Sequence, residues 1–322
     1  MSTKRSLVHP KFKTKYRVAN WSDYDRSLVE RGNITLWLTP AAMASWNAKP
    51  TRRRGGQRKY SDVAIETALT LRLLLHLPLR QTEGFLRSIF ELMGVSLDVP
   101  DHTTMSRRSA SLAVSLRVRP RAGSINLVID SSGLSTFGEG QWAAVKHGGK
   151  GIQGWRKLHL GVDENGAIVA QALTNANVDD ATTGISLIDE VNSKIKTVIA
   201  DGATVISDDA YDTRSFYAAA ESRGARVVVP PDKTATVGGD LSRDRDRAVR
   251  RIRKVGRRQW KTEVGYHRQA QVENTFFRLK TILGDRMRAR GEDAQRTEAV
   301  IACNMLNQMT ELGRPESYAI GR

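Results

Sequence analysis

The sequence predicts an α/β protein, in which a mixed five-stranded sheet with flanking helices follows an all-α N-terminal region. Apolar residues repeat at helical spacing between residues 61 and 115, whereas short apolar runs of strand length dominate after residue 124. Three of these runs precede the first helix of the second region, and two later runs alternate with helices. Three meandering strands followed by strand–helix crossovers form a sheet with both antiparallel and parallel pairs.

Three helices are predicted in the N-terminal region. The run SDVAIETALTLRLLLHL (61–77) begins at Ser61, a favourable N-cap residue, and is apolar on most faces, as in a buried helix. The run RQTEGFLRSIFELMG (80–94) has one apolar face and ends at a glycine. We expect Thr103 or Thr104 to cap a third, shorter helix.

The third helix would expose Arg107 and Arg108. Two packed helices followed by a short one with polar and basic residues near its start are typical of a helix-turn-helix DNA reader. We therefore interpret residues 61–115 as a helical DNA-binding domain. Plain helix packing is the alternative, because many helical bundles share this pattern.

The second region, residues 125–322, is predicted to be one α/β domain, with the boundary at residues 116–124. The turn ENG joins the second and third strands as a hairpin. Asp130 ends the first strand and Asp201 follows the fourth. The strands are expected at 125–130, 154–163, 167–176, 195–200 and 225–231, and the helices between them at 179–195 and 212–224.

The charge of the chain indicates a polyanionic partner, most simply double-stranded DNA. The 322 residues carry a formal net charge of +17, and the isoelectric point is near 10.3. Residues 1–60, which we interpret as a basic N-terminal arm, hold fourteen Lys or Arg against three acidic residues, and residues 243–258 hold nine against two. We expect both clusters to contact phosphates. The arm includes Arg52, Arg53 and Arg54.

Other classes of protein fit the sequence less well. It contains no apolar run long enough to span a membrane, and its basic start lacks the apolar segment of a secretory signal. Cys303 is the only cysteine, which excludes an intrachain disulfide and suits a reducing cytoplasm. We expect a cytoplasmic protein with no membrane partner.

Three strands, helix, strand, helix, strand, helix is the order of a ribonuclease H-like fold. In such a sheet the first and fourth strands are neighbours, so Asp130 and an acid after the fourth strand would lie together, with Glu273 arriving from the last helix. Three converging carboxylates repel one another unless cations neutralise them. Mg²⁺, a hard ion that prefers oxygen ligands, suits such a site, and two metal ions can promote phosphodiester cleavage. We predict Asp130, Asp201 and Glu273 as ligands.

The predicted last helix, YHRQAQVENTFFRLK (266–280), places Tyr266, Glu273 and Lys280 seven residues apart and therefore on one face. Val272 and Phe276 follow the spacing of a buried stripe. Glu273 thus sits at the border of an apolar face, where a ligand role explains a carboxylate, and Lys280 would reach a DNA phosphate.

Nearly the whole chain resembles bacterial insertion-sequence transposases of the DDE type, close to insertion-sequence family five. The resemblance rests on YRVANWSDYDRSLVERGNITLWL, LRQTEGFLRSIFELMGVSLDVPDHTTMSRR, LVIDSSGLSTFGEGQWAAVKHG, WRKLHLGVD, DAYDTR and GYHRQAQVENTFFRLKTILG. The last segment is similar to the Tyr-Arg-Glu-Lys signature of that family. The resemblance implies that Asp130 and Glu273 are the first and third catalytic acids, with Tyr266 and Lys280 as their signature partners.

Two features depart from the family pattern. The signature arginine usually follows the tyrosine by three residues, but position 269 is Gln, with Arg268 beside it. The motif of the second acid is split: ADGATVISDDAYDT matches its left half at Asp201 and its right half at Asp208. We favour Asp201 because it follows a clear strand, and Asp208 stays open because its AYDT context is better.

The resemblance implies Mg²⁺-dependent strand cleavage and strand transfer, with Mn²⁺ as a substitute, on the terminal inverted repeats of the element and on target DNA. Assembly on two DNA ends implies a homodimer or a larger oligomer. Two alternatives stay open: another ribonuclease H-like nuclease, and a DNA-binding protein derived from a transposase whose second acidic motif has decayed.

Overall fold

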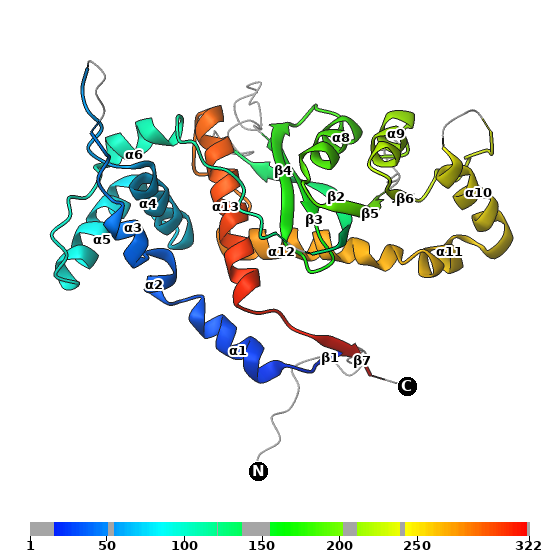
Figure 1. Ribbon diagram of the computed structural model, residues 1–322, viewed down its shortest axis with the longest axis horizontal. Helices are drawn as coiled ribbons and strands as arrows, with labels where there is room; N and C mark the ends of the chain where they lie inside the picture. The colour runs from blue at the N-terminus through cyan, green and yellow to red at the C-terminus, as the bar shows by residue number, and fades with distance from the viewer. Residues whose placement is uncertain are drawn as a thin grey trace, which may run out of the picture.

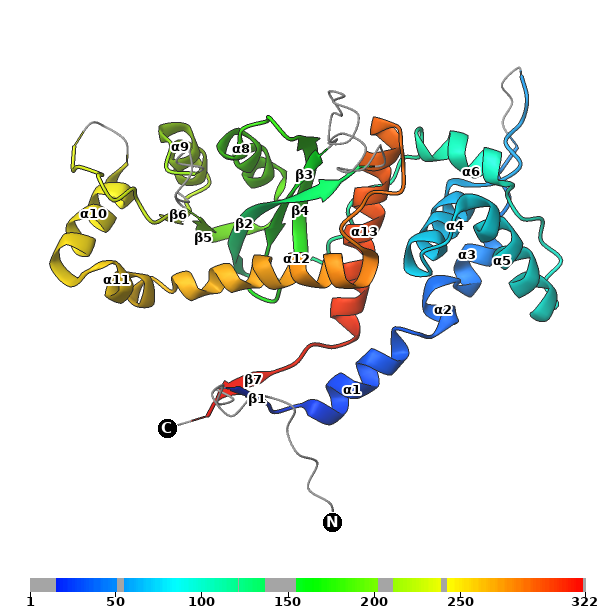
Figure 2. The same cartoon turned by 180° about the vertical axis from the view of Figure 1, so that it is seen from behind.

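The computed structural model has a central sheet between an N-terminal group of helices and a basic helical extension (Figure 1). The opposite view shows the same three parts in reversed order (Figure 2). The predicted residues Arg52, Arg53, Arg54 and Asp208 lie outside the described residues. The structure describes residues 16–50, 55–120, 122–136, 155–201, 211–238 and 242–320.

The sheet is mixed and five-stranded, in the order β4-β3-β2-β5-β6. β2, β3 and β4 are antiparallel neighbours, whereas β5 and β6 run parallel to β2. The predicted strand order, with the first and fourth strands of this region side by side, is therefore confirmed. The strands are β2 (Ser124–Ser135), β3 (Trp155–Val162), β4 (Ile168–Asn175), β5 (Lys194–Ala200) and β6 (Arg226–Val228).

Alternate residues of each strand belong to two separate cores, because successive side chains point to opposite faces of a sheet. Leu127 and Ile129 of β2 pack with α8 (Asp180–Glu190) and α9 (Arg214–Ser222) on one face. Val128 packs on the other face, beneath α12 (Ala270–Leu283) and α13 (Glu292–Leu312). Each face of the sheet therefore has its own layer of helices.

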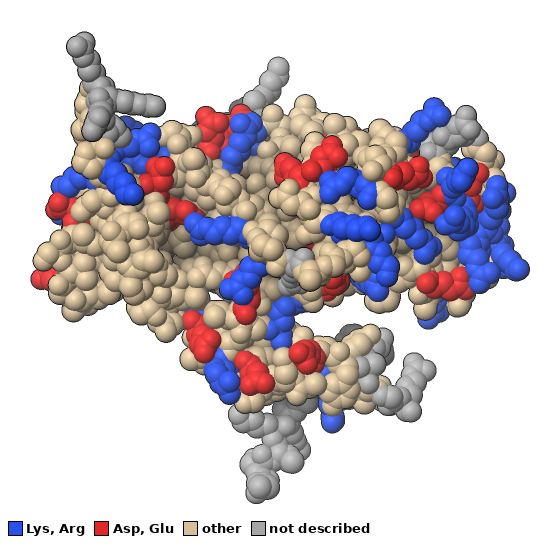
Figure 3. Space-filling model, viewed as in Figure 1, with Lys and Arg blue, Asp and Glu red and all other residues tan. Residues whose placement is uncertain are grey.

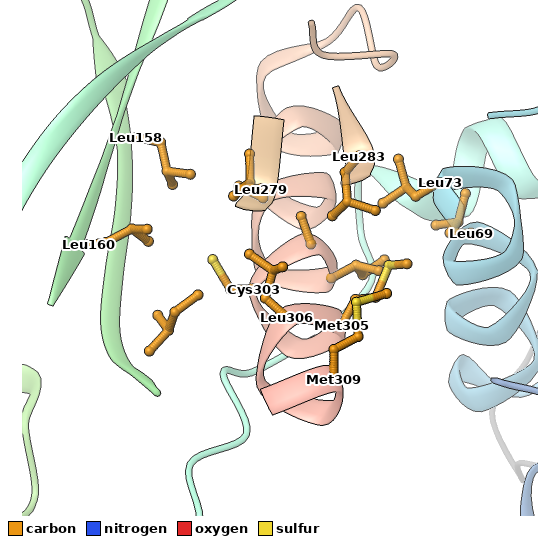
Figure 4. Packing of buried hydrophobic residues seen from close by; sticks show 14 of the residues in the cluster. Leu69, Leu73, Leu158, Leu160, Leu279, Leu283, Cys303, Met305, Leu306 and Met309 are labelled. Carbon is orange, nitrogen blue, oxygen red and sulfur yellow. The ribbon is translucent and has the colours of Figure 1, made fainter. Parts of the chain in front are cut away.

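The second core continues from the sheet into the N-terminal helices. Leu279 and Leu283 of α12 and Met305 of α13 lie between the sheet and α4 (Figure 4). Leu69 and Leu73 of α4 complete this layer from the other side. The N-terminal helices and the sheet thus share one hydrophobic core. The N-terminal helices are α1 (Trp21–Glu30), α2 (Ile34–Trp37), α3 (Pro40–Ala44), α4 (Asp62–Leu74), α5 (Leu79–Leu92) and α6 (His102–Ser109).

The cap of α6 differs from the one predicted. Asp101, not Thr103 or Thr104, is the N-cap residue, and its carboxylate accepts hydrogen bonds of 2.9 Å from the backbone N–H groups of both threonines. The threonine hydroxyls donate to the same carboxylate. A carboxylate before two threonines is the better acceptor, because it carries a full charge at the positive end of the helix.

Two basic helices extend from the far end of the sheet. The inner face of α10 (Arg243–Val255) is fixed by Arg245, whose Nε donates a 3.0 Å hydrogen bond to the buried carboxylate of Asp212. The outer face carries exposed arginines, and Figure 3 shows Lys and Arg gathered there. α11 (Arg257–Glu263) connects α10 to the 3₁₀ turn η1 (Tyr266–Gln269) and α12.

The ends of the described chain meet far from the sheet. β1 (Tyr16–Val18) pairs antiparallel with β7 (Ser317–Ala319), which follows α13. Within the described ranges, every helix is too short or too polar to span a bilayer.

Candidate active site

Two aspartates meet at one edge of the sheet because of the register of β2 and β5. These strands are parallel neighbours, and Ile129 lies opposite Ala200. The next residues are Asp130 and Asp201, so both carboxylates lie at the same level of the sheet. β2 continues to Ser135 through its pairing with β3, whereas the sequence predicted that it would end at Asp130.

Glu273 approaches this edge from α12, on the face of the sheet that Val128 and Asp130 share. The predicted helix over 266–280 is divided, because residues 266–269 form η1 and the α-helix begins at Ala270. The buried Gln269 side chain contributes to holding this junction against β2, with Nε2 3.4 Å from the carbonyl oxygen of Ile129. Gln269 is therefore part of the core, beside the peptide group that joins Ile129 to Asp130.

Asp130 is the electrostatic centre of the site. Burial raises its pKa from the ordinary value of 3.8 to about 6. A hydrogen bond from the Ser131 N–H, at 2.8 Å, opposes this shift, while the nearby carboxylates of Asp201 and Glu273 add to it. Negative charges from two other segments, the end of β5 and α12, thus act on one half-buried carboxyl group.

Tyr266 fixes the carboxylate of Asp201. Its hydroxyl donates a 2.6 Å hydrogen bond to Oδ1 of Asp201, and the ammonium of Lys261 lies 4.2 Å from the centre of its ring. Burial, together with this hydrogen bond, raises the pKa of the Tyr266 hydroxyl, which therefore stays protonated and continues to donate. The tyrosine of the signature is in direct contact with the acid that the sequence favoured.

A fourth carboxylate, Asp180, also raises the pKa of Asp130. It lies at the first residue of α8, on the opposite face of the sheet from Glu273, and accepts hydrogen bonds from Ser131 and Lys157. Sequence reasoning missed it. Two adjacent aspartates at the start of a helix are usual capping residues, and Asp179 does cap α8. No sequence signal distinguishes Asp180 from that role, since its partners come from β2 and β3.

The donor set suits a hard divalent cation, although the described residues contain no group of three or more Asp, Glu, His or Cys side chains in the arrangement of a formed metal site. The chemical fit rests on charge and on donor type: the carboxylates of Asp201 and Glu273 act electrostatically on Asp130, and carboxylate oxygens are the ligands that hard cations prefer. Asp130, Asp201 and Glu273 are the residues that could hold such an ion.

Two family models described as "Transposase DDE domain" match the chain. One covers residues 122–308, which include the whole sheet and all three predicted metal ligands, and the other covers residues 29–139. The chain belongs to the DDE transposase family. The ribonuclease H-like architecture predicted for it is confirmed by this match together with the mixed five-stranded sheet. DDE transposases typically use divalent metal ions.

The other predicted residues that the structure describes in this DDE transposase differ in exposure. Arg268 is exposed on η1, and Lys280 is half-buried on α12, two turns beyond Glu273. Arg107 is exposed on α6. Arg108 instead pairs with Asp62 and donates a 3.0 Å hydrogen bond to the Tyr60 carbonyl, so it ties α6 to the start of α4.

Proposed function

We propose that this DDE transposase binds the terminal inverted repeats of an insertion sequence of family five, cleaves the DNA at the element ends, and joins the freed 3′ ends to target DNA. One observation carries the proposal: Asp130 is half-buried where Asp201 and Glu273, from the end of β5 and from α12, act on it electrostatically. A structural role offers no reason to gather like charges from three distant segments.

The proposed ligands are Asp130, Asp201 and Glu273, and the proposed cofactor is Mg²⁺, with Mn²⁺ as a substitute. When bound, a pair of such ions supplies Lewis acidity to the attacking oxygen and to the leaving oxygen of a phosphodiester. The protein's part is positional. β2 and β5 fix two acids through their backbone register, η1 orients Asp201 through Tyr266, and α12 brings Glu273.

The DNA partners follow from the charge distribution. α10, which carries exposed arginines, and α6, which carries the exposed Arg107, lie toward opposite ends of the molecule with the sheet between them (Figure 1). Lys280 and Arg268 flank the acids themselves. We propose that these residues, with Arg52, Arg53 and Arg54, contact phosphates on either side of the scissile bond. Pairing of two ends requires at least a homodimer, and the proposed location is the cytoplasm.

The test uses duplex oligonucleotides that carry the repeats flanking the gene. The wild-type protein should nick these ends with Mg²⁺ or Mn²⁺ and transfer the 3′ ends into a supercoiled plasmid. Asp130→Ala and Glu273→Ala should bind the repeat normally and lose both reactions. Repeat-specific binding by the wild type without nicking in either metal would contradict the proposal.

That outcome would favour the second candidate, a DNA-binding protein derived from a transposase. The uncharged Gln269 at the position of the signature arginine gives this candidate specific support, because an arginine there would offset the charges around Asp130. Repeat-independent cutting of branched DNA would instead favour another nuclease of the same fold. Point variants separate these cases better than removal of residues 1–115, which would expose the core shared with α12 and α13.

A further inference from the structure

A continuous chain of hydrogen bonds links Lys157 to Asp130 through Asp180. Lys157 Nζ donates to Oδ1 of Asp180 at 2.9 Å, and Ser131 Oγ donates to Oδ2 of the same carboxylate at 3.0 Å. The backbone N–H of Ser131 then donates to Oδ1 of Asp130 at 2.8 Å. Asp180 thus holds the hydroxyl of Ser131, and the backbone N–H of Ser131 in turn fixes Asp130.

Because β2 is pleated, groups on opposite faces of the sheet contact neighbouring residues of this strand. Asp130 shares the α12 face with Val128, whereas Ser131 points to the α8 face, as Ile129 does. Ser131 lies opposite His159 in the register of β2 and β3, and Lys157 is two residues before His159 on the same face. Glu273 and Asp180 therefore act on neighbouring residues of one strand from opposite sides.

The α8 side also contains buried polar atoms with unused hydrogen-bonding capacity. Within the described part of the chain, the hydroxyl of Tyr211 is buried without a partner, and the residue is only 1% exposed. The carboxylates of Asp180 and Asp130 act on this hydroxyl electrostatically. Nδ1 of the fully buried His159 is likewise unpartnered, 3.9 Å from Oδ1 of Asp180. Such atoms mark a place where a water molecule or a ligand oxygen completes the network.

The negative charge of Asp180 is partly offset by the ammonium of Lys157. Its side chain is 20% exposed and the paired Lys157 side chain 29%, so the ion pair is partly shielded from solvent and its field reaches Asp130. Lys157 is fixed from a second direction, because Nζ also donates to the Val178 carbonyl at 3.0 Å. One carboxylate therefore adds negative charge to the site, and one ammonium limits it.

We propose that Asp180 is a positioning residue of the catalytic centre, which fixes Asp130 through Ser131 and contributes charge that favours a divalent cation, while Lys157 moderates that charge. The proposal rests on the proposed function of the three-carboxylate site. It adds a fourth acid, on the α8 face, that the signature of the family does not contain.

The test measures Mn²⁺ affinity of the full-length protein by electron paramagnetic resonance, without DNA, so that no cleavage is needed for a readout. Asp180→Asn should weaken Mn²⁺ binding by roughly 10- to 100-fold, the usual effect of removing a partner of a metal ligand.

The matched control is Asp179→Asn. It removes the same charge one residue away, from an exposed side chain, and keeps the α8 cap because asparagine caps as well as aspartate. We expect less than a threefold change for it, roughly the effect of an exposed charge.

Lys157→Met gives the sharper contrast. If Lys157 moderates the charge of Asp180, removal of its ammonium should leave Mn²⁺ binding as tight as in the wild type or tighter. If the three residues only support the fold, Lys157→Met and Asp180→Asn should both weaken binding. Single-turnover cleavage adds a second readout. Asp180→Asn should slow the chemical step, while the protein concentration that gives the half-maximal rate is unchanged.

Equal affinities for Asp180→Asn and Asp179→Asn would overturn the role of Asp180 alone, provided that Asp130→Asn abolishes binding. A wild-type protein that binds no Mn²⁺ would instead overturn the metal site of the proposed function, and the role of Asp180 with it. If Asp180→Asn does not fold by circular dichroism, Ser131→Ala replaces it. That variant should weaken Mn²⁺ binding severalfold, and wild-type affinity would contradict the proposal.

Discussion

The hydroxyl of Tyr266 donates a 2.6 Å hydrogen bond to the carboxylate of Asp201, 65 residues away in the sequence. This hydrogen bond joins η1 to the end of β5 and aligns Asp201 with the edge of the sheet where Asp130 lies. It also gives the tyrosine of the signature a physical role, because an oriented carboxylate loses less conformational freedom when it binds an ion.

We expect Tyr266→Phe to lower the rate of DNA cleavage about 10- to 100-fold, because the ring stays in place while the donor to Asp201 is removed. The measurement is single-turnover cleavage of an end duplex, with binding affinity measured in parallel. Lys261→Met, which removes the cation over the same ring, is the control and should affect cleavage far less. Wild-type cleavage by Tyr266→Phe would show that this hydrogen bond does not serve catalysis.

Asp201→Asn and Asp208→Asn should differ sharply in activity. Tyr266 holds Asp201, and the carboxylates of Asp201 and Glu273 together act on Asp130. The loss of the Asp201 carboxylate should therefore remove detectable cleavage. Asp208→Asn should retain most of the activity. The same cleavage assay compares both, and equal residual cutting would refute the assignment of the second acid to Asp201.

Asp101→Ala should destabilise the protein by about 1 kcal/mol, because α6 loses its N-cap, whereas Asp101→Asn should cost less, because asparagine still caps the helix but carries no charge. Chemical denaturation at pH 7 measures both free energies of unfolding. The hydrogen bonds from Thr103 and Thr104 hold the pKa of Asp101 well below its usual range.

A lowered pKa in the folded state means that the charged cap stabilises the protein fully above the unfolded pKa of about 3.9, and that this contribution is lost as the pH falls below it. The difference between the wild type and Asp101→Ala should therefore shrink in acid. A difference that is constant between pH 7 and pH 3 would mean that the charge of Asp101 does not contribute to the cap.

DNA binding should weaken steeply with salt, and the outer face of α10 should contribute to that dependence. The side chains of Arg247 and Arg250 are 65% and 67% exposed, and each forms an ion pair with an aspartate of its own helix. Such pairs of exposed side chains contribute little to stability, so both arginines can turn to DNA. Replacing both by alanine should reduce the slope of log K against log salt by about 0.9 for each phosphate that the variant no longer neutralises. Arg296→Ala on α13, whose side chain is 57% exposed and also pairs along its own helix, is the control. An unchanged slope for the α10 variant would remove α10 from the DNA interface.

The five strands of the central sheet were predictable because short apolar runs and turn residues are local signals, and their order followed from the succession of strands and helices. The short pair β1 and β7 was not predicted. Asp180 was not, because its importance comes from Ser131 and Lys157, which reach it only through the register of β2 and β3. The division at Tyr266–Gln269 was also hidden. Helical spacing continues through that segment, and its 3₁₀ geometry follows from hydrogen bonds with β2 and with the residue that follows β5.

The helix α13 had no predicted counterpart, for a different reason. Its buried positions include Gln295, Asn304 and Asn307, which interrupt the apolar pattern. Asn304 and Asn307 donate to the backbone carbonyls of Ser115 and Arg117, the segment that leads from the helices to the sheet. These hydrogen bonds and the shared core connect the N-terminal helices with the sheet across the predicted boundary at 116–124.

Anomalous scattering from Mn²⁺-soaked crystals is the decisive measurement of whether Asp130, Asp201 and Glu273 together bind a divalent cation. We expect an anomalous peak within about 2.0 to 2.6 Å of carboxylate oxygens of Asp130 and its two partners, the range of hard-cation contacts. The peak should disappear in Asp130→Asn crystals. Mn²⁺ bound elsewhere, with no peak at this edge of the sheet, would show that these three acids do not form a metal site.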